Sequence, residues 1–76
     1  MNRLDFLNAI IEIIEIEENI DENTILSDIE EWDSLAAVTT LALFKQKLGL
    51  NVGAQSVLNC KTVKDLLDLG NNKYNG

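Results

Sequence analysis

Apolar residues near the start of the chain recur at the spacing of an α-helix. Three, four and three residues separate the series Leu4, Leu7, Ile11 and Ile14, and the same face is widened by Phe6, Ile10 and Ile13. This pattern predicts an amphipathic helix over residues 3–17. Asn2 is the expected N-cap of this helix, with Asp5 three residues later in its first turn.

The chain has 76 residues, which predicts a single domain spanning 1–76. It contains one cysteine, Cys60, and no histidine, so neither an internal disulfide nor a structural zinc site is expected. A core this small must then be stabilised by packing. Abundant aliphatic residues and the absence of proline favour a compact all-α helical bundle.

The remaining segments follow from local signals. Residues 19–33 break the helical pattern and predict a long loop, with room for one helical turn, that is anchored by Ile20, Ile25, Leu26 and Ile29. A second helix is expected over 34–48 and should end at Gly49 in a left-handed conformation. Loops of this length in small domains are often functional.

The last third of the chain predicts two short elements and a tail. Residues 53–59 suit a short helix or turn, with Val57 and Leu58 pointing inward. Thr62 and Asp65 have the spacing of a capping box, which predicts a final helix ended by Gly70. Residues 71–76 have little to bury and are expected to be disordered.

Apolar residues of the second helix project as two adjacent stripes. One stripe, assigned to the core, contains Ala37, Leu41, Phe44 and Leu48, and the other contains Leu35, Val38 and Ala42. Ser34 projects between the two stripes at the start of the helix. A second stripe left exposed there would be a docking surface for a partner, whereas a wide core would bury both stripes.

Acidic residues are concentrated in the first part of the chain. Residues 1–33 carry a net charge of −10 and residues 34–76 a net charge of +3. An acidic field repels phosphate backbones, which argues against nucleic acid as a partner and favours a basic protein surface. Alternatively, the acids of residues 12–22 form only a solvated face. The spacing of Asp21, Asn23 and Asp28 lacks the glycine of a calcium loop, so no metal site is expected.

Three residues at the predicted start of the second helix, Asp33-Ser34-Leu35, carry the main functional signal. An exposed serine at a helix N-terminus is a suitable attachment point for a charged prosthetic group, because unpaired N–H groups and the helix dipole favour an anion there. The same three residues could also be an ordinary helix cap.

In its context, the chain resembles the acyl carrier proteins of the phosphopantetheine-attachment family over about residues 3–70. The resemblance rests on Asp33-Ser34-Leu35, the long preceding loop, the acidic balance, the length and the late Thr62-Val63 helix start. It implies that a phosphopantetheinyl transferase uses coenzyme A and a metal ion to join 4′-phosphopantetheine to Ser34. The arm would carry an acyl or aminoacyl group as a thioester. Asp33 would cap the helix and Leu35 would begin the docking surface. The resemblance also implies the fold of the family, a small four-helix bundle with three longer helices, one short helix and a long loop between the first two helices.

The resemblance also implies a carrier rather than an enzyme, and the chain offers no evident nucleophile–base pair. Its expected partners are the transferase, a loading ligase for the acyl or aminoacyl group, and a downstream synthase or transferase. The alternative function is a small acidic protein-interaction bundle without a prosthetic group. No signal peptide or membrane-length apolar run is evident, so a cytoplasmic monomer without membrane insertion is expected.

Two departures from the family pattern point to a specialised pathway rather than primary fatty acid synthesis. The second helix presents no acids, and its expected exposed positions are Ala36, Thr39, Thr40, Gln46 and Lys47. Trp32 stands where the family often has a smaller residue. It is either a loop anchor or part of the docking surface with Leu35, Val38 and Ala42. Cys60 is expected to be a small buried apolar residue.

Overall fold

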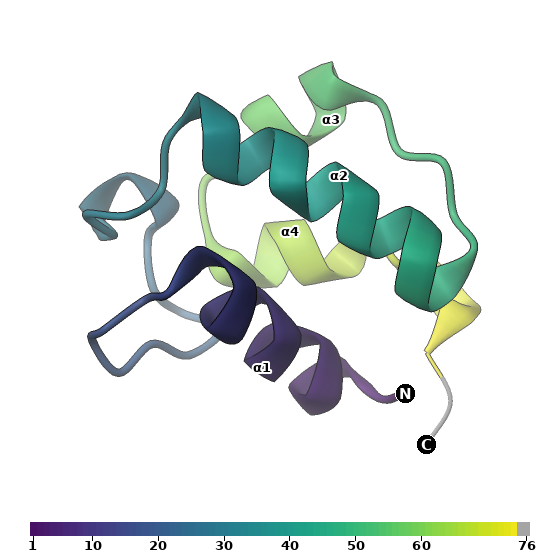
Figure 1. Ribbon diagram of the computed structural model, residues 1–76, viewed down its shortest axis with the longest axis horizontal. Coiled ribbons are helices and arrows are strands. Elements are labelled where there is room, and N and C mark those ends of the chain that lie inside the picture. The colour runs from purple at the N-terminus through teal and green to yellow at the C-terminus, as the bar shows by residue number, and fades with distance from the viewer. Residues whose placement is uncertain (75–76) are drawn as a thin grey trace.

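The computed structural model describes residues 1–74 and contains helices as its regular elements (Figure 1). In chain order they are α1 (Arg3–Ile14), the 3-10 turn η1 (Leu26–Asp28), α2 (Ser34–Leu48), α3 (Ala54–Leu58), α4 (Val63–Asp68) and the 3-10 turn η2 (Asn71–Lys73). The predicted all-α four-helix fold is confirmed. The last helix is shorter than expected, because α4 has six residues and is close in length to α3, which has five.

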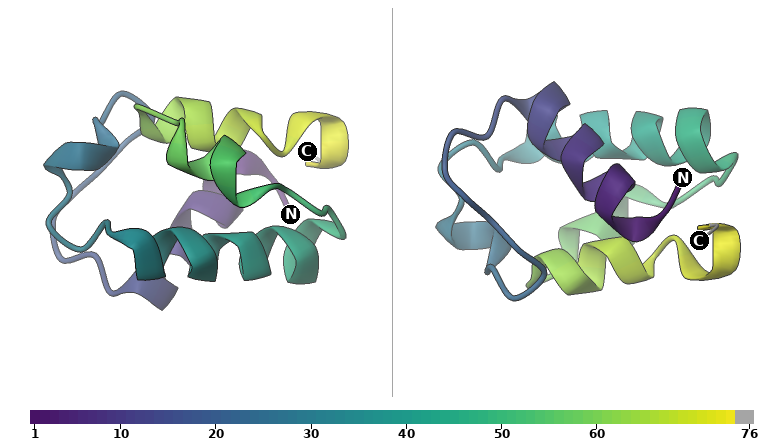
Figure 2. Two further views of the ribbon diagram at one scale, coloured as in Figure 1. Left: turned by 90° about the horizontal axis from the view of Figure 1, so that it is seen from above. Right: turned by 90° about the horizontal axis from the view of Figure 1, so that it is seen from below.

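The helices pack so that α1 lies against both α2 and α4, and α3 lies against α2. Figure 2 shows α2 and α4 running in the same general direction, with α1 crossing them diagonally. The N-terminal ends of α2 and α4 therefore lie on the side of the molecule that the long loop covers (Figure 1). No helix within residues 1–74 combines the length and apolarity needed to cross a bilayer.

Helix α1 starts as predicted but ends early. The Asn2 side chain accepts the Asp5 amide at 2.8 Å, and the Asp5 carboxylate accepts the Asn2 amide at 3.3 Å, which completes a capping box. The helix ends at Ile14 rather than at residue 17, because Glu15 adopts a left-handed conformation with φ 61°. This turn directs the chain back so that Ile16 is buried in the core.

The loop between α1 and α2 is fastened to the start of α4. The amide of Leu26 donates to the carbonyl of Lys61 at 2.8 Å, and the amide of Val63 donates to the carbonyl of Thr24 at 2.9 Å. Leu26 and Ile29 are buried, as predicted, whereas Ile25 is 47% exposed and does not anchor the loop through its side chain. The paired backbone groups hold the long loop in one conformation next to α4.

The core is centred on the rings of Phe6 and Phe44, which are fully buried with centroids 4.8 Å apart. Ala36 and Thr40 were expected to be exposed but are buried. The Thr40 hydroxyl can be buried because it donates to the Ala36 carbonyl at 2.9 Å. The physical reason is that α2 packs against α1 and α3 at once, so the buried sector of α2 is wider than one apolar stripe.

Leu58 and Tyr74 also differ from expectation. Val57 is buried, as predicted, but Leu58 is 56% exposed because a five-residue helix can present only one side to the core. The predicted tail was expected to bury little, yet the Tyr74 hydroxyl donates to the Leu67 carbonyl at 2.6 Å. Its ring stacks edge-to-face on Phe6 with centroids 5.9 Å apart. Residues 75–76 lie outside the described part of the chain.

Tyr74 gives the fold a testable pH dependence at high pH. Burial raises the pKa of Tyr74 to about 12, with a smaller opposing effect from the Arg3 guanidinium. The folded state thus favours the neutral phenol, and this stabilisation is fully present below the ordinary tyrosine pKa of about 10. It is lost as pH rises from about 10 to about 12. We expect the free energy of unfolding, measured by urea denaturation, to fall more steeply with pH in this window for the native chain than for Tyr74→Phe. An equal fall with pH in the two proteins would contradict the burial of the Tyr74 phenol.

Candidate functional site

The site is built around the first residue of α2. Asp33 lies in an extended conformation before the helix, and its carboxylate accepts the Ala36 amide at 2.8 Å. Its carbonyl accepts the Ala37 amide at 3.0 Å. Asp33 is therefore the predicted N-cap, and Ser34 occupies the first helical position.

Ser34 is exposed and lies next to backbone N–H groups that are free to donate a hydrogen bond. Within residues 1–74, no acceptor pairs with the backbone amides of Ser34 and Leu35. The residues present thus fit a phosphate joined to the Ser34 oxygen, because unpaired amides and the positive end of the α2 dipole both favour an anion. A group attached to Ser34 would leave the helix cap in place, because the cap is formed by Asp33 and does not use the Ser34 side chain.

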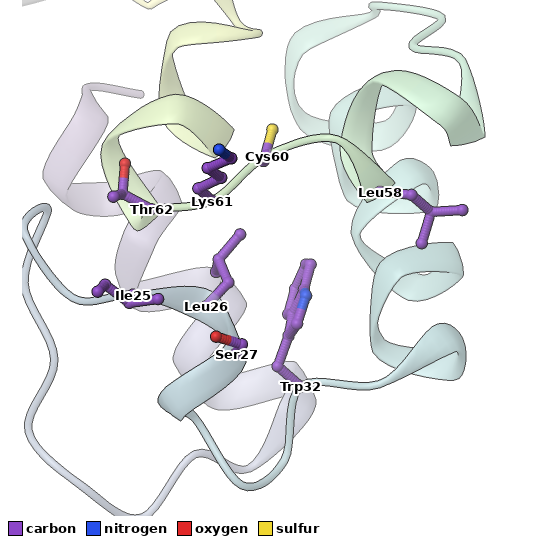
Figure 3. Close-up of a pocket in the computed structure, with 8 residues that line it drawn as sticks. All are labelled: Ile25, Leu26, Ser27, Trp32, Leu58, Cys60, Lys61 and Thr62. Carbon is purple, nitrogen blue, oxygen red and sulfur yellow. The ribbon is translucent and has the colours of Figure 1, made fainter.

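Two hollows flank the start of α2. The first, of about 490 Å³, is lined by Trp32 together with residues of the loop, of α3 and of the segment before α4. In Figure 3 the indole of Trp32 points toward the Cys60–Lys61 segment, whereas the side chain of Leu58 points away from Trp32. Trp32 also packs against the core, so it serves as a loop anchor and as one wall of this hollow.

The second hollow, of about 250 Å³, lies between the C-terminal end of α1 and the N-terminal end of α2. Its lining includes Asp33 and Leu35, the two neighbours of Ser34. Leu35 is 73% exposed and Val38 is 58% exposed. Ala42 is exposed as well, so the predicted stripe on α2 is open to solvent. Trp32 lines the first hollow and Leu35 lines the second.

Cys60 and Arg3 make contacts that do not involve Ser34. Cys60 is only partly buried, and its thiol donates to the Ser56 carbonyl at 3.3 Å. Burial, with smaller contributions from Asp65 and Asp68, raises the pKa of the Cys60 thiol. Arg3 bonds to Glu22 at 2.6 Å and to Asp68 at 2.9 Å, which joins α1 to the loop and to α4.

Residues 1–74 contain no cluster of three or more histidine, cysteine or acidic side chains that could hold a metal ion. The acids near Ser34 are arranged around the second hollow instead, where Glu15 and Glu31 join Asp33. Sequence reasoning did not find the contribution of α1 to this hollow. The sequence does show that Ile13 is an apolar residue close to Glu15 in the chain. That Ile13 and Leu35 line the same hollow depends on how α1 crosses α2, which the sequence does not show.

Comparison with known proteins assigns the sequence of this chain to a family. The family model described as "Phosphopantetheine attachment site" matches residues 5–69, which include the whole site. Neither the comparison with curated proteins nor that with solved structures found a match. Domains of this family bind 4′-phosphopantetheine covalently and act as carriers rather than as enzymes. The match spans most of the chain, and the chain therefore belongs to the phosphopantetheine attachment site family.

Proposed function

We propose that the chain is an acyl carrier protein in which 4′-phosphopantetheine is joined to Ser34 and carries an acyl or aminoacyl cargo. The observation that carries this assignment is an exposed serine at the first position of a helix that Asp33 caps, with two unpaired amides beside the serine oxygen. When bound, the arm supplies a terminal thiol for a thioester. The chain's own residues hold the anchoring end of the arm.

Each residue of the site has a distinct task in this proposal. The Ser34 oxygen would form the new bond to phosphorus as the phosphoanhydride of coenzyme A breaks and adenosine 3′,5′-bisphosphate leaves, and the serine proton would pass to a base of the transferase. The chain has no histidine to accept that proton. The amides of Ser34 and Leu35 would then face the phosphodiester anion. Asp33 keeps the first turn of α2 intact throughout, because its bond to Ala36 does not involve Ser34.

The surface of α2 supports a specialised pathway. Beyond Ser34 this helix carries no acid, and Lys45 and Lys47 are exposed in its last turns. Enzymes that recognise a carrier through acids along this helix would find neutral and basic side chains instead. Charge mismatch of this kind lowers the association rate and selects against the wrong partner. A dedicated set of loading and acyl-transferring enzymes fits this surface better than the enzymes of primary fatty acid synthesis.

Attachment can be tested by counting thiols. The chain contains one cysteine, so the unmodified protein should show one reactive thiol after unfolding. Incubation with coenzyme A and a broad-specificity phosphopantetheinyl transferase should add the mass of one arm and a second thiol. In the Cys60→Ser background the count should rise from none to one. A protein that gains neither the mass nor the thiol contradicts the proposed function.

The same arm-bearing protein tests the pathway. We expect primary fatty acid enzymes to load and elongate it at least about tenfold more slowly than their own carrier, since lost charge complementarity acts on association. The measurement is the rate of acyl transfer at equal carrier concentrations. Elongation at a comparable rate would contradict the specialised role while leaving the carrier assignment intact.

A further inference from the structure

A groove beside Ser34 continues around the C-terminal end of α1. The hollow between α1 and α2 shares Ile14, Glu15 and Glu31 with an adjoining hollow of about 440 Å³ that also includes Glu17 and Glu30. We call the two together the acidic groove. Figure 2 shows that the C-terminal end of α1 and the N-terminal end of α2 lie on the same side of the molecule.

The groove is strongly anionic. Its lining contains no lysine or arginine and includes five carboxylates, namely Glu15, Glu17, Glu30, Glu31 and Asp33. The one arginine of the acidic part of the chain, Arg3, is bonded to Glu22 and Asp68 and does not line the groove. The negative charge beside Ser34 is therefore not neutralised by the chain itself. Uncompensated carboxylates in one groove raise the local attraction for a cationic surface.

Glu31 lines both hollows of the groove and is itself partly buried. One carboxylate oxygen accepts the Glu17 amide at 3.3 Å, while the other oxygen is buried and has no hydrogen-bond donor within the described residues. This oxygen is closed to solvent, so the charge that the groove presents to a partner comes from its exposed carboxylates, Glu15, Glu17, Glu30 and Asp33.

The groove also has an apolar wall. Ile13 from α1 and Leu35 from α2 both line it, and they are 47% and 73% exposed. Large apolar side chains that remain exposed beside a charged groove are typical of a protein-interaction surface. Acids for recognition are absent from α2 beyond Asp33, so the groove supplies the charge that α2 lacks.

We propose that the acidic groove is the surface through which this carrier meets the enzymes that act at Ser34, and that these enzymes present a basic side chain beside an apolar one. The inference rests on the proposed function, because it concerns enzymes that must approach Ser34. It assigns partner recognition to the end of α1 and to the loop residues Glu30 and Glu31. The exposed length of α2 would contribute through Leu35 and its apolar neighbours.

The first test removes charge from the groove without touching Ser34. Glu17 and Glu30 are exposed, and within residues 1–74 neither side chain forms an ion pair or a hydrogen bond. The double variant Glu17→Gln, Glu30→Gln should raise the KM for the carrier about tenfold in a reaction with coenzyme A and a transferase that has a basic carrier-binding face. The effect should shrink as salt is added.

A matched control separates the groove from net charge. Asn51→Lys together with Asn72→Lys changes the net charge by the same amount at two exposed positions. These positions follow the C-terminal end of α2 and lie in η2, at the opposite end of the molecule from the start of α2 (Figure 1). We expect a change in KM of less than about twofold. Equal effects of the two pairs would overturn the inference, because only the overall charge would then matter.

The apolar wall is tested in the same reaction. Ile13→Gln should raise KM about fivefold, since it removes an apolar contact from the wall of the groove. Leu4→Gln is the control, because Leu4 is 63% exposed on the same helix but does not line the groove. An equal change in KM for the two variants would overturn the assignment of the wall. If the native chain takes up no arm at all, the proposed function itself fails, and the inference falls with it.

Discussion

Phe44→Ala is expected to lower the free energy of unfolding by about 3–5 kcal/mol, the range for removing a large buried aromatic side chain. Phe44 is fully buried, and its ring centroid lies 4.8 Å from that of Phe6. The protein has no disulfide that could compensate, because its single cysteine is free. A domain of this size has a total stability of about 4–11 kcal/mol at 0.05–0.15 kcal/mol per residue. The variant should therefore lose a large part of the stability of the native chain.

The measurement is urea denaturation followed by far-ultraviolet circular dichroism, with Val38→Ala as the matched control. Val38 lies on the same helix and is 58% exposed, so its truncation should change the free energy of unfolding by no more than about 0.5 kcal/mol. Similar midpoints for the two variants would show that α2 does not pack through the face that contains Phe44.

The starts of the helices could be predicted because their signals are local. Asn2 with Asp5, and Thr62 with Asp65, form capping boxes, and Asp33 caps α2 with its side chain. Gly49 ends α2 with φ 64°, as its lack of a side chain suggests. Each of these features depends on residues at most four positions apart. The order of helices and the location of Ser34 follow from them.

Features that depend on tertiary packing could not be predicted in the same way. Glu15 ends α1 in a left-handed conformation, which is usually adopted by glycine at this position. The residue type at position 15 therefore did not predict the end of the helix. Ala36 and Thr40 are buried because α2 contacts two other helices. Tyr74 packs on Phe6, which is distant in sequence. These contacts become visible only when the helices are placed relative to one another.

The candidate site divides in a similar way. Asp33, Ser34 and Leu35 were evident from the sequence, and the structure places Asp33 as the cap and leaves Leu35 exposed. In the sequence, the acids of residues 1–33 could be described only as one region of negative charge. The structure instead gathers Glu15, Glu17, Glu30 and Glu31 around one hollow at the C-terminal end of α1 and pairs Glu22 with Arg3. The turn of the chain at Glu15 brings the acids at the end of α1 next to Glu30 and Glu31 of the loop. No residue type in the sequence predicted that turn.

Ser34→Ala is expected to abolish attachment of the arm while leaving the fold unchanged. The Ser34 side chain is exposed and takes part in no hydrogen bond within residues 1–74, and the α2 cap belongs to Asp33. Alanine is also the better helix former, so the stability change should be no more than about 0.5 kcal/mol. The loss of the arm would then be chemical, caused by the missing oxygen. Ser27→Ala and Ser56→Ala are the controls, since Ser27 and Ser56 are the other two serines of the chain.

The measurement that tests this account most directly is the intact mass of these proteins after incubation with coenzyme A and a phosphopantetheinyl transferase. We predict the mass of one phosphopantetheine group on the native chain and on the Ser27→Ala and Ser56→Ala controls, and no gain on Ser34→Ala. A gain of the same mass on Ser34→Ala, or its absence from the native chain, would contradict the assignment of Ser34 as the attachment site.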